Sequence, residues 1–212
     1  MKATFDYKKA GVNIDIADKA KSSIKSLVRK TFTKGAFSDI GKFGGFFSIK
    51  HLKYKDPVFV SSVDGVGTKL KVASLIKKYD TVGTDLVNHC VNDILVHGAK
   101  PLFFLDYIAM AKTEPKIVYD IVKGLVNACK KEGCALVGGE TAQMPDVYRG
   151  ADFDLVGLVV GVVEKSKIID GKNIKAGDIM IGFPSNGLHT NGYTLARKLL
   201  LEREKYSVNS HV

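Results

Sequence analysis

Tryptophan is absent from this 212-residue sequence, and cysteine and proline are scarce, with three and five residues respectively. The cysteines, at positions 90, 129 and 134, are odd in number and form no CxxC pair, so neither a disulfide framework nor a zinc site is expected. No apolar run approaches the roughly 20 residues of a membrane helix. Residues 1–7 lack the apolar stretch of a secretory signal. These absences predict a cytoplasmic protein with no membrane partner.

The net charge is +10, and most of the positive surplus falls in residues 1–55, which hold 13 Lys and Arg against 4 Asp. An asymmetry of this kind permits binding to a nucleic acid or to an anionic small molecule. A lysine-rich solvated helix face is the simpler explanation. Because the sequence contains no recognisable nucleic-acid-binding module, we expect no nucleic-acid partner.

An acid, two glycines and a lysine follow a β-branched stretch, residues 57–61, that predicts a strand; the run reads Asp64-Gly65-Val66-Gly67-Thr68-Lys69. Glycines after a strand let backbone N–H groups approach an anion closely. A lysine adds positive charge for a phosphate, and an acid at a strand end can hold Mg²⁺. The run is not a Walker A loop, because Thr68 separates Gly67 from Lys69. A tight glycine turn with a solvated lysine is the alternative.

Residues 85–97 predict a helix with two contrasting faces. One arc is apolar, and the opposite arc carries five polar side chains, which are Asp85, Asn88, His89, Asn92 and Asp93. A solvated helix face usually carries Lys and Glu, and this arc has neither. The composition therefore favours a functional surface over a merely solvated one.

Strands interleave with helices along the rest of the chain, which indicates an α+β, or mixed α/β, fold. We expect helices at 15–32, 70–79 and 115–131 and strands at 102–108, 135–137 and 154–163. Between the first helix and the first strand, residues 33–50 are rich in glycine and phenylalanine and predict a mobile loop. Asp106 lies inside an apolar strand and is a weak ligand candidate, because a buried carboxylate needs a partner. Gly138-Gly139-Glu140-Thr141 repeats the pattern of small residues, an acid and a hydroxyl after a strand.

A domain boundary is predicted where charged and turn residues cluster, which divides the chain into 1–168 and 169–212. The second part should contain a strand at 179–183 and a helix at about 192–204. One strand and one helix cannot bury each other's apolar faces, so this part resembles the opening of a further domain. The loop at 185–192 contains two Asn-Gly pairs. It forms either two tight turns or a platform that presents polar side chains at a helix start.

Together these motifs resemble those of the phosphoribosylformylglycinamidine cyclo-ligase (aminoimidazole ribonucleotide synthetase) family of purine biosynthesis. The matching runs occur in the family's order and span residues 7 to 197. Some are shared with a wider ATP-using superfamily that includes thiamine-monophosphate kinase and selenophosphate synthetase. The runs specific to the cyclo-ligase are Tyr7–Asp15, Phe103–Tyr107 and His189–Gly192.

The resemblance implies an ATP-dependent ring closure of formylglycinamidine ribonucleotide to aminoimidazole ribonucleotide, with ATP and Mg²⁺ as cofactors. It also implies a homodimer in which the N-terminal sheets pair in a barrel. By motif, the implied metal ligands are Asp64, Asp93 and Glu140, and the implied catalytic residues are Lys69 and His189. The implied substrate contacts are His189, Thr190 and Asn191. The implied ATP contacts are Gly44, Gly45, Asp64, Gly65, Lys69, Asn92, Asp93, Gly138, Gly139 and Glu140.

The sequence departs from the family at its C-terminus, because family members carry a second domain of a size similar to the first and only its beginning is present here. Whether the chain turns over substrate by itself is therefore a separate question. Two alternatives remain open. One is a related ATP-dependent small-molecule phosphotransferase, and the other is a non-catalytic, dimerising nucleotide-binding fragment.

Overall fold

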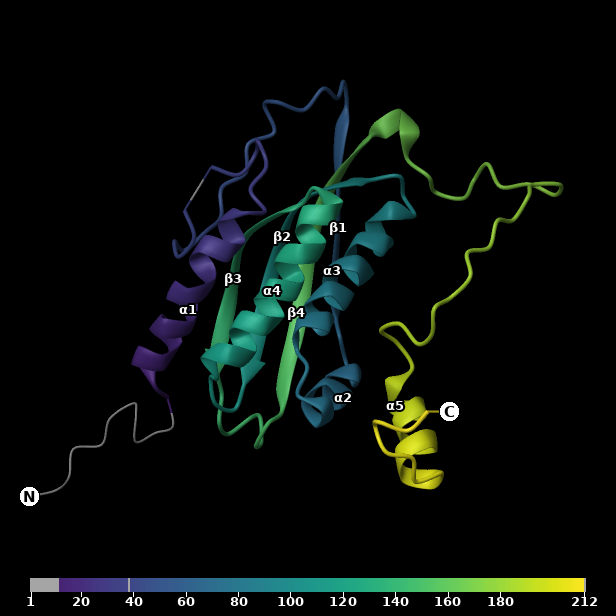
Figure 1. The fold of residues 1–212 in the computed structure, drawn as a ribbon. Helices are drawn as coiled ribbons and strands as arrows, with labels where there is room; N and C mark the ends of the chain where they lie inside the picture. The colour runs from purple at the N-terminus through teal and green to yellow at the C-terminus, as the bar shows by residue number, and fades with distance from the viewer. Residues whose placement is uncertain (1–11, 38, 212) are drawn as a thin grey trace, which may run out of the picture.

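A mixed four-stranded sheet forms the centre of the protein in the computed structural model, which describes residues 12–37 and 39–211 (Figure 1). The strand order is β1-β4-β2-β3. Strand β4 is antiparallel to both β1 and β2, whereas β3 is parallel to β2. The strands are β1 (Pro57–Gly65), β2 (Lys100–Met110), β3 (Ala135–Gln143) and β4 (Phe153–Glu164). The mixed α/β fold expected from the sequence is confirmed.

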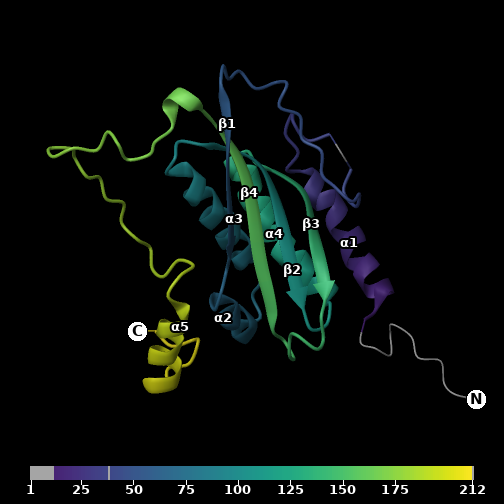
Figure 2. The same cartoon turned by 180° about the vertical axis from the view of Figure 1, so that it is seen from behind.

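Helices cover one face of this sheet, and Figure 2 shows the strands in front of the helical layer from the opposite side. The long helices are α1 (Ile14–Arg29), α3 (Asp80–Leu95) and α4 (Pro115–Glu132), and α4 lies between the other two. The short helix α2 (Lys69–Ile76) starts four residues after β1 ends. Large side chains buried between the two layers include Leu86, Phe104, Ile121 and Leu125.

Helices α3 and α4 approach each other at two glycines. A Cβ on Gly83 would overlap the carbonyl oxygen of Ile121, and a Cβ on Gly124 would overlap the carbonyl oxygen of Asp80. The hydroxyl of Thr84 donates to the Gly124 carbonyl oxygen at 3.2 Å across the same crossing. The close backbone contact fixes the spacing of α3 and α4 over the sheet.

The sheet is longer at two places than the sequence predicts. Strand β1 continues through Asp64 to Gly65, and β3 continues through Gly138, Gly139 and Glu140 instead of ending at residue 137. Parallel pairing with β2 runs as far as Met110 opposite Gln143, so backbone pairing holds the glycine-rich segment extended. The second glycine motif is therefore part of a strand and not a loop that follows one.

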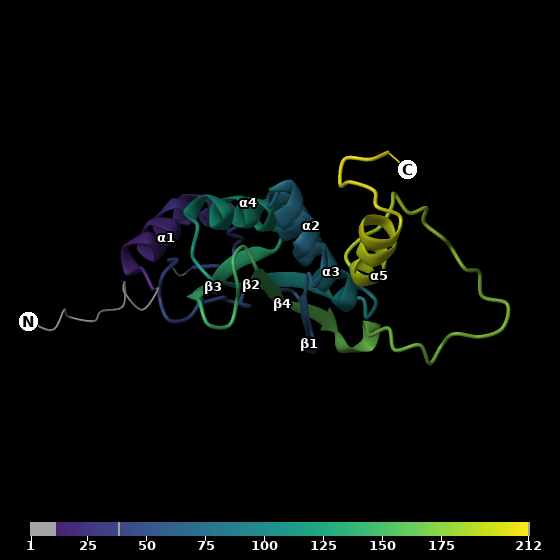
Figure 3. The same ribbon diagram turned by 90° about the horizontal axis from the view of Figure 1, so that it is seen from below.

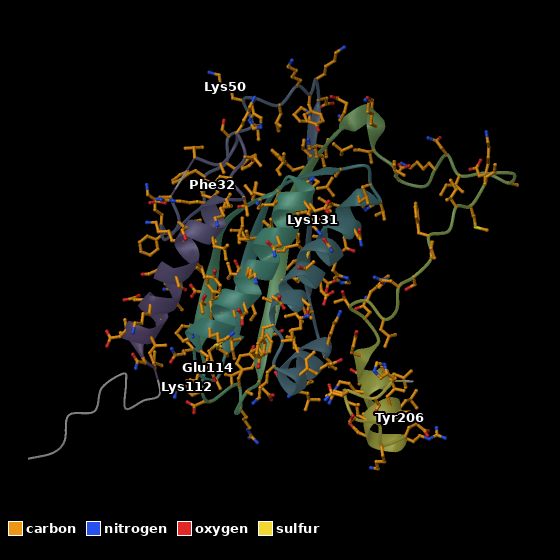
Figure 4. All side chains as sticks on the ribbon, in the orientation of Figure 1. Phe32, Lys50, Lys112, Glu114, Lys131 and Tyr206 are labelled. Carbon is orange, nitrogen blue, oxygen red and sulfur yellow. The ribbon has the colours of Figure 1, made fainter. Side chains whose placement is uncertain are left out.

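The chain after residue 168 differs from expectation. A helical segment is present as predicted, formed by α5 (Tyr193–Arg197) and a π-helical stretch, η2 (Lys198–Arg203). The predicted strand at 179–183 does not form, because none of the described residues lies beside it to pair with its backbone. Figure 4 shows this part of the chain as an extended segment that runs apart from the sheet. The predicted boundary at residue 168 remains a prediction.

Residues 33–50, predicted as a loop, contain no helix or strand, although residue 38 is outside the described chain. An isolated bridge pairs Ala36 with Phe47, and the Phe47 ring lies 5.2 Å from that of Phe103 on β2. The first part of the Tyr7–Asp15 motif, residues 7–11, lies outside the described residues. Within 12–37 and 39–211, no helix combines the length and apolarity needed to cross a bilayer.

Candidate functional site

Two matched polar pairs join β1 to α3. The Ser62 hydroxyl donates to Asp93 Oδ2 at 2.6 Å, and His89 Nε2 lies 2.5 Å from Asp64 Oδ2. Residues two apart on a strand are about 6.8 Å apart and lie on one face, and residues four apart on a helix are about 6 Å apart on one face. The strand period and the helix period therefore bring both pairs into register along this end of the sheet.

The Asp64 carboxylate has a donor on each oxygen. Its Oδ1 accepts the backbone N–H of Gly65 at 2.7 Å, and its Oδ2 contacts His89. The side chain of Asp64 is 42% exposed, so the carboxylate remains open to solvent. Two partners fix the orientation of this acid without covering it, which suits a group that meets a ligand.

Cys90 lies buried beneath the same acids. Burial raises the pKa of its thiol to about 12, and the nearby carboxylates of Asp64 and Asp93 add to that effect. The thiol therefore stays protonated at neutral pH and is a poor nucleophile.

Lys69, the last residue of the glycine run, is engaged by two other parts of the chain. Its Nζ lies 2.6 Å from Asp85 Oδ2 on α3 and donates to the carbonyl oxygen of His189 at 2.7 Å. The ammonium also lies 5.3 Å from the centroid of the Tyr193 ring. The hydroxyls of Thr68 and Thr194 are 2.9 Å apart beside it. The structure thus brings together the first glycine motif and the loop that carries His189.

The imidazole of His189 turns toward its own loop. Its Nε2 lies 3.2 Å from Ser185 Oγ and 3.2 Å from Asn186 Oδ1. Thr190 is buried, whereas Asn191 is exposed. The three residues predicted to contact substrate therefore have different environments, and the two exposed ones, His189 and Asn191, face solvent.

The second glycine motif lines a cavity of about 490 Å³ between β3, α1 and residues 40–43. Gly138, Gly139 and Glu140 line it together with Lys21 and Lys25 of α1. Lys42 and Asp106 line it as well, so the cavity combines backbone glycines, three amines and two carboxyl groups, a composition that suits a polar ligand.

Close approaches explain two glycines on β3 or packed against it, of which Gly139 lines the cavity and Gly45, like Gly44, is not among its lining residues. A Cβ on Gly45 would lie 2.6 Å from the Val137 carbonyl oxygen, so the glycine-rich loop can lie against β3 only with glycine there. Nothing lies within 4 Å of a Cβ placed on Gly44. Gly139 lies directly over the Asp106 carboxyl, where a side chain would overlap Oδ1. Burial, and next the negative charge of Glu140, raise the pKa of Asp106 to about 7.

The predicted ATP contacts therefore fall into two groups on one sheet. Asp64, Gly157, Asp106 and Gly139 are opposite one another on successive strands, so the row runs from the β1 edge to the β3 edge. At about 4.8 Å between strands, the two edges are roughly 14 Å apart. Glu140 lies at the far edge and is not brought to Asp64 and Asp93. Among residues 12–37 and 39–211, no three His, Cys, Asp or Glu side chains form a metal-binding group.

Two residues acquire roles that sequence reasoning did not assign. His89 and Asp85 lie on the polar arc of α3, and the motifs assign a role to neither. The structure shows them as the partners of Asp64 and Lys69. The absence of Lys and Glu from that arc indicates a functional helix face. It does not indicate which residues of other elements the face contacts. Asn92, a predicted ATP contact, is exposed on α3.

Comparison with known families decides the relationship. Residues 51–163, more than half of the chain, match the family described as AIR synthase related protein, N-terminal domain. This chain belongs to that family. The family resemblance inferred from the motifs is thereby confirmed.

Relatives of the AIR synthase family extend the similarity over nearly all of the chain. Phosphoribosylformylglycinamidine cyclo-ligase of Alkaliphilus metalliredigens is 51% identical over 97% of this chain and 59% of its own length. The cyclo-ligase of Clostridium novyi is 56% identical over 92% of this chain and 58% of its own length. The chain thus spans somewhat less than 60% of these two curated relatives.

The fold is also found in a solved structure. Thiamine-monophosphate kinase from Stenotrophomonas maltophilia matches 69% of this chain and 43% of its own with a TM-score of 0.51. The sequence identity is 15%, so this likeness concerns the fold alone.

Proposed function

We propose that this chain supplies the ATP-binding and dimerisation part of a phosphoribosylformylglycinamidine cyclo-ligase. The observation that carries the proposal is the meeting of Lys69 with the His189 loop beside Asp64 and Asp93. Segments more than 100 residues apart converge there, in a chain half identical to named cyclo-ligases. A reaction of this kind belongs in the cytoplasm, where ATP is available.

The proposed reaction closes an imidazole ring at the expense of ATP. The γ-phosphoryl group passes to the formyl oxygen of formylglycinamidine ribonucleotide and ADP leaves. An internal nitrogen then attacks the same carbon, and phosphate departs with that oxygen, which yields aminoimidazole ribonucleotide. ATP is needed because an amide oxygen leaves poorly and phosphate leaves well.

The residues present fit magnesium bound together with a nucleotide. Mg²⁺ is usually held by one or two carboxylates plus phosphate oxygens and water, and Asp64 and Asp93 offer two carboxylates at one end of the sheet. Bound there, the ion would neutralise charge on the ATP phosphates. Glu140 would join this set only if a second copy or a rearrangement brought it near. Lys69 would add positive charge at the transferred group.

The glycine-lined cavity is proposed to take another part of the nucleotide. Lys21 and Lys25 provide amines at its wall, and Gly138 and Gly139 leave backbone groups accessible. Lys25 also pairs with Asp39 at 3.0 Å, which ties α1 to the loop that closes the cavity. His189 and Asn191, which are exposed, are proposed to face the ribonucleotide.

A homodimer is proposed through the sheet face that the helices leave open, seen edge-on in Figure 3. Alternate residues of β4, namely Val156, Leu158 and Val160, are only half-buried, while their neighbours in the strand face the helices. On β1, Phe59 is 54% and Val63 is 65% exposed. An apolar sheet face of this size is expected to pack on a second one, and the second copy of this chain supplies it.

A coupled ADP assay on the purified protein, after its intact mass has been measured, tests the reaction. ADP release that requires formylglycinamidine ribonucleotide supports the cyclo-ligase. ADP release with thiamine monophosphate and none with the ribonucleotide supports the phosphotransferase alternative. A fragment that only binds nucleotide would show a rise in melting temperature with Mg-ATP and no turnover.

A further inference from the structure

Residues 170–211 contact the rest of the protein sparsely. Of all the residues from 168 to 211, only Thr190 is buried. The segment 178–188 is exposed throughout. A loop with so little buried surface is held by its polar contacts, and Thr68 and Lys69 supply those contacts from the sheet-and-helix unit.

Lys69 contacts this loop in two ways and is anchored to α3 in a third. Its ammonium donates to the His189 carbonyl oxygen at 2.7 Å, lies 5.3 Å from the Tyr193 ring centroid, and is paired with Asp85 at 2.6 Å. The Lys69 and Asp85 side chains are only 18% and 22% exposed. A partly buried pair is screened by salt less than a surface pair, so it can hold a neighbouring segment in place.

Asp85 fixes the direction of the ammonium. Its Oδ2 is buried and makes no hydrogen bond of ordinary geometry, so its contact with Lys69 is an ion pair. A buried carboxylate without its cation costs several kcal/mol, which keeps Lys69 directed at α3. A lysine ammonium has three donors, and the His189 carbonyl oxygen takes one of them in a hydrogen bond. The ion pair with Asp85 and the hydrogen bond to His189 together hold the ammonium between α3 and the loop.

We propose that Lys69 is a latch that holds the loop 185–194 against the first glycine motif, with Asp85 as its positioning residue. The latch couples the two ends of the proposed site, because the loop carries His189, Thr190 and Asn191 while Lys69 belongs to the nucleotide end. Its role in the reaction rests on the proposed function. The latch itself is a property of the chain without any ligand.

Hydrogen exchange read by mass spectrometry on the whole 212-residue chain, without nucleotide, tests the latch. Lys69→Met and Asp85→Asn should each raise the exchange rate of amides in 186–194 by about tenfold. Lys69→Arg, which keeps a cation and its donors, should restore most of the protection. Peptides from β4 and α4 should be unchanged, which separates loss of the latch from a general loss of stability.

The Lys71–Asp152 ion pair, two residues along the same helix, provides a matched control. Lys71→Met removes a lysine from α2 without touching the loop, so it should leave exchange in 186–194 unchanged. If Asp85→Asn disturbs the whole fold, Tyr193→Leu takes its place as the test. This change lies in the loop and cannot unfold the sheet, and it should also raise the exchange rate of the loop amides. An unprotected wild-type loop, an unchanged loop in Lys69→Met, or an equal effect of Lys71→Met would overturn the latch.

These outcomes are independent of the proposed reaction. Failure of the ADP assay alone would remove the cyclo-ligase function and leave the exchange result intact. Unchanged exchange together with ribonucleotide-dependent ADP release would remove the latch and leave the reaction intact.

Discussion

Asp64 is held at both oxygens yet remains solvent-accessible, which makes it the clearest test of nucleotide binding at the residue scale. Asp64→Asn keeps the shape of the side chain and removes its charge. We expect the rise in melting temperature caused by Mg-ATP to fall by at least half, because a carboxylate is a far better Mg²⁺ ligand than an amide. The variant should itself lose only about 1 kcal/mol of stability, the size of one hydrogen bond.

The matched control is Asp170→Asn, which removes an exposed carboxylate that pairs with Lys172 outside the sheet. This control should respond to Mg-ATP as the wild type does. Equal nucleotide responses in the Asp64 variant and the wild type would reject the metal role of Asp64.

Asp106 predicts a pH dependence of stability. Its pKa is raised from 3.8 to about 7 in the folded protein, so the folded state binds more protons than the unfolded state between those values. The contribution of the Asp106 carboxyl to the free energy of unfolding therefore falls as the pH rises from about 4 to 7, and it is constant above pH 7. Asp106→Asn removes the charge, and it should stabilise the protein at pH 8 by up to about 4 kcal/mol relative to wild type.

Urea unfolding of both proteins at pH 8 and pH 5 measures this effect. The difference between variant and wild type should be clearly smaller at pH 5, because the wild-type carboxyl is then mostly protonated. A difference that is independent of pH would show that Asp106 does not titrate in this range.

Residue roles were predictable where one motif carries its own chemistry, and not where partners come from distant segments. The glycine run identified Lys69 and Asp64 by type and spacing. The partners of Lys69 come from α3 and from a loop about 120 residues away, so no local pattern reveals them. The sequence also gave no reason to expect that Glu140 would lie across the sheet from Asp64.

At the scale of elements, α3 and α4 can pack closely because glycines, which have no side chain, lie where the two helices cross. Gly124→Ala replaces the poorest ordinary helix former with the best, which by propensity alone would add about 1 kcal/mol of stability. The new Cβ would overlap the Asp80 carbonyl oxygen, so the helices must separate. We expect a net loss of about 2–4 kcal/mol in the free energy of unfolding, by analogy with overpacked cores.

Chemical denaturation measures that loss, and Lys123→Ala at the exposed neighbouring position is the control. The control should change stability by less than about 0.5 kcal/mol. A stabilised Gly124→Ala protein would mean that the two helices are not in close contact in solution.

Elements with a clear period were predicted with small errors at their ends. The amphipathic spacing placed α1 and α4 within three residues of their observed bounds. The expected strand at 179–183 is absent, because a strand needs a neighbour and composition alone cannot supply one. Strand β3 was predicted too short, because glycines and an acid are typical of loops, and pairing with β2 overrides that tendency.

At the scale of the whole molecule, the open face of the sheet decides the assembly. Val63→Lys places a charge in the middle of the proposed dimer interface, so the variant should be a monomer at concentrations where the wild type is a dimer. Light scattering coupled to size exclusion measures the mass directly. Because Val63 is 65% exposed in a single chain, the change should cost the monomer little stability.

Val147→Lys is a closely matched control, since this valine is 67% exposed and lies outside the sheet. It should leave the mass unchanged. A wild-type protein that is monomeric at high micromolar concentration would remove the dimer from the proposal.

The exposed segment from Ile179 to Phe183 affects the solubility of the protein. Four of its five side chains are large and apolar, and each is at least 80% exposed, while its backbone has no pairing partner among the described residues. Such a stretch recruits strands from other molecules and seeds precipitation. We therefore expect these five residues to govern the rate of aggregation in concentrated solution, and a single lysine placed among them should lower that rate.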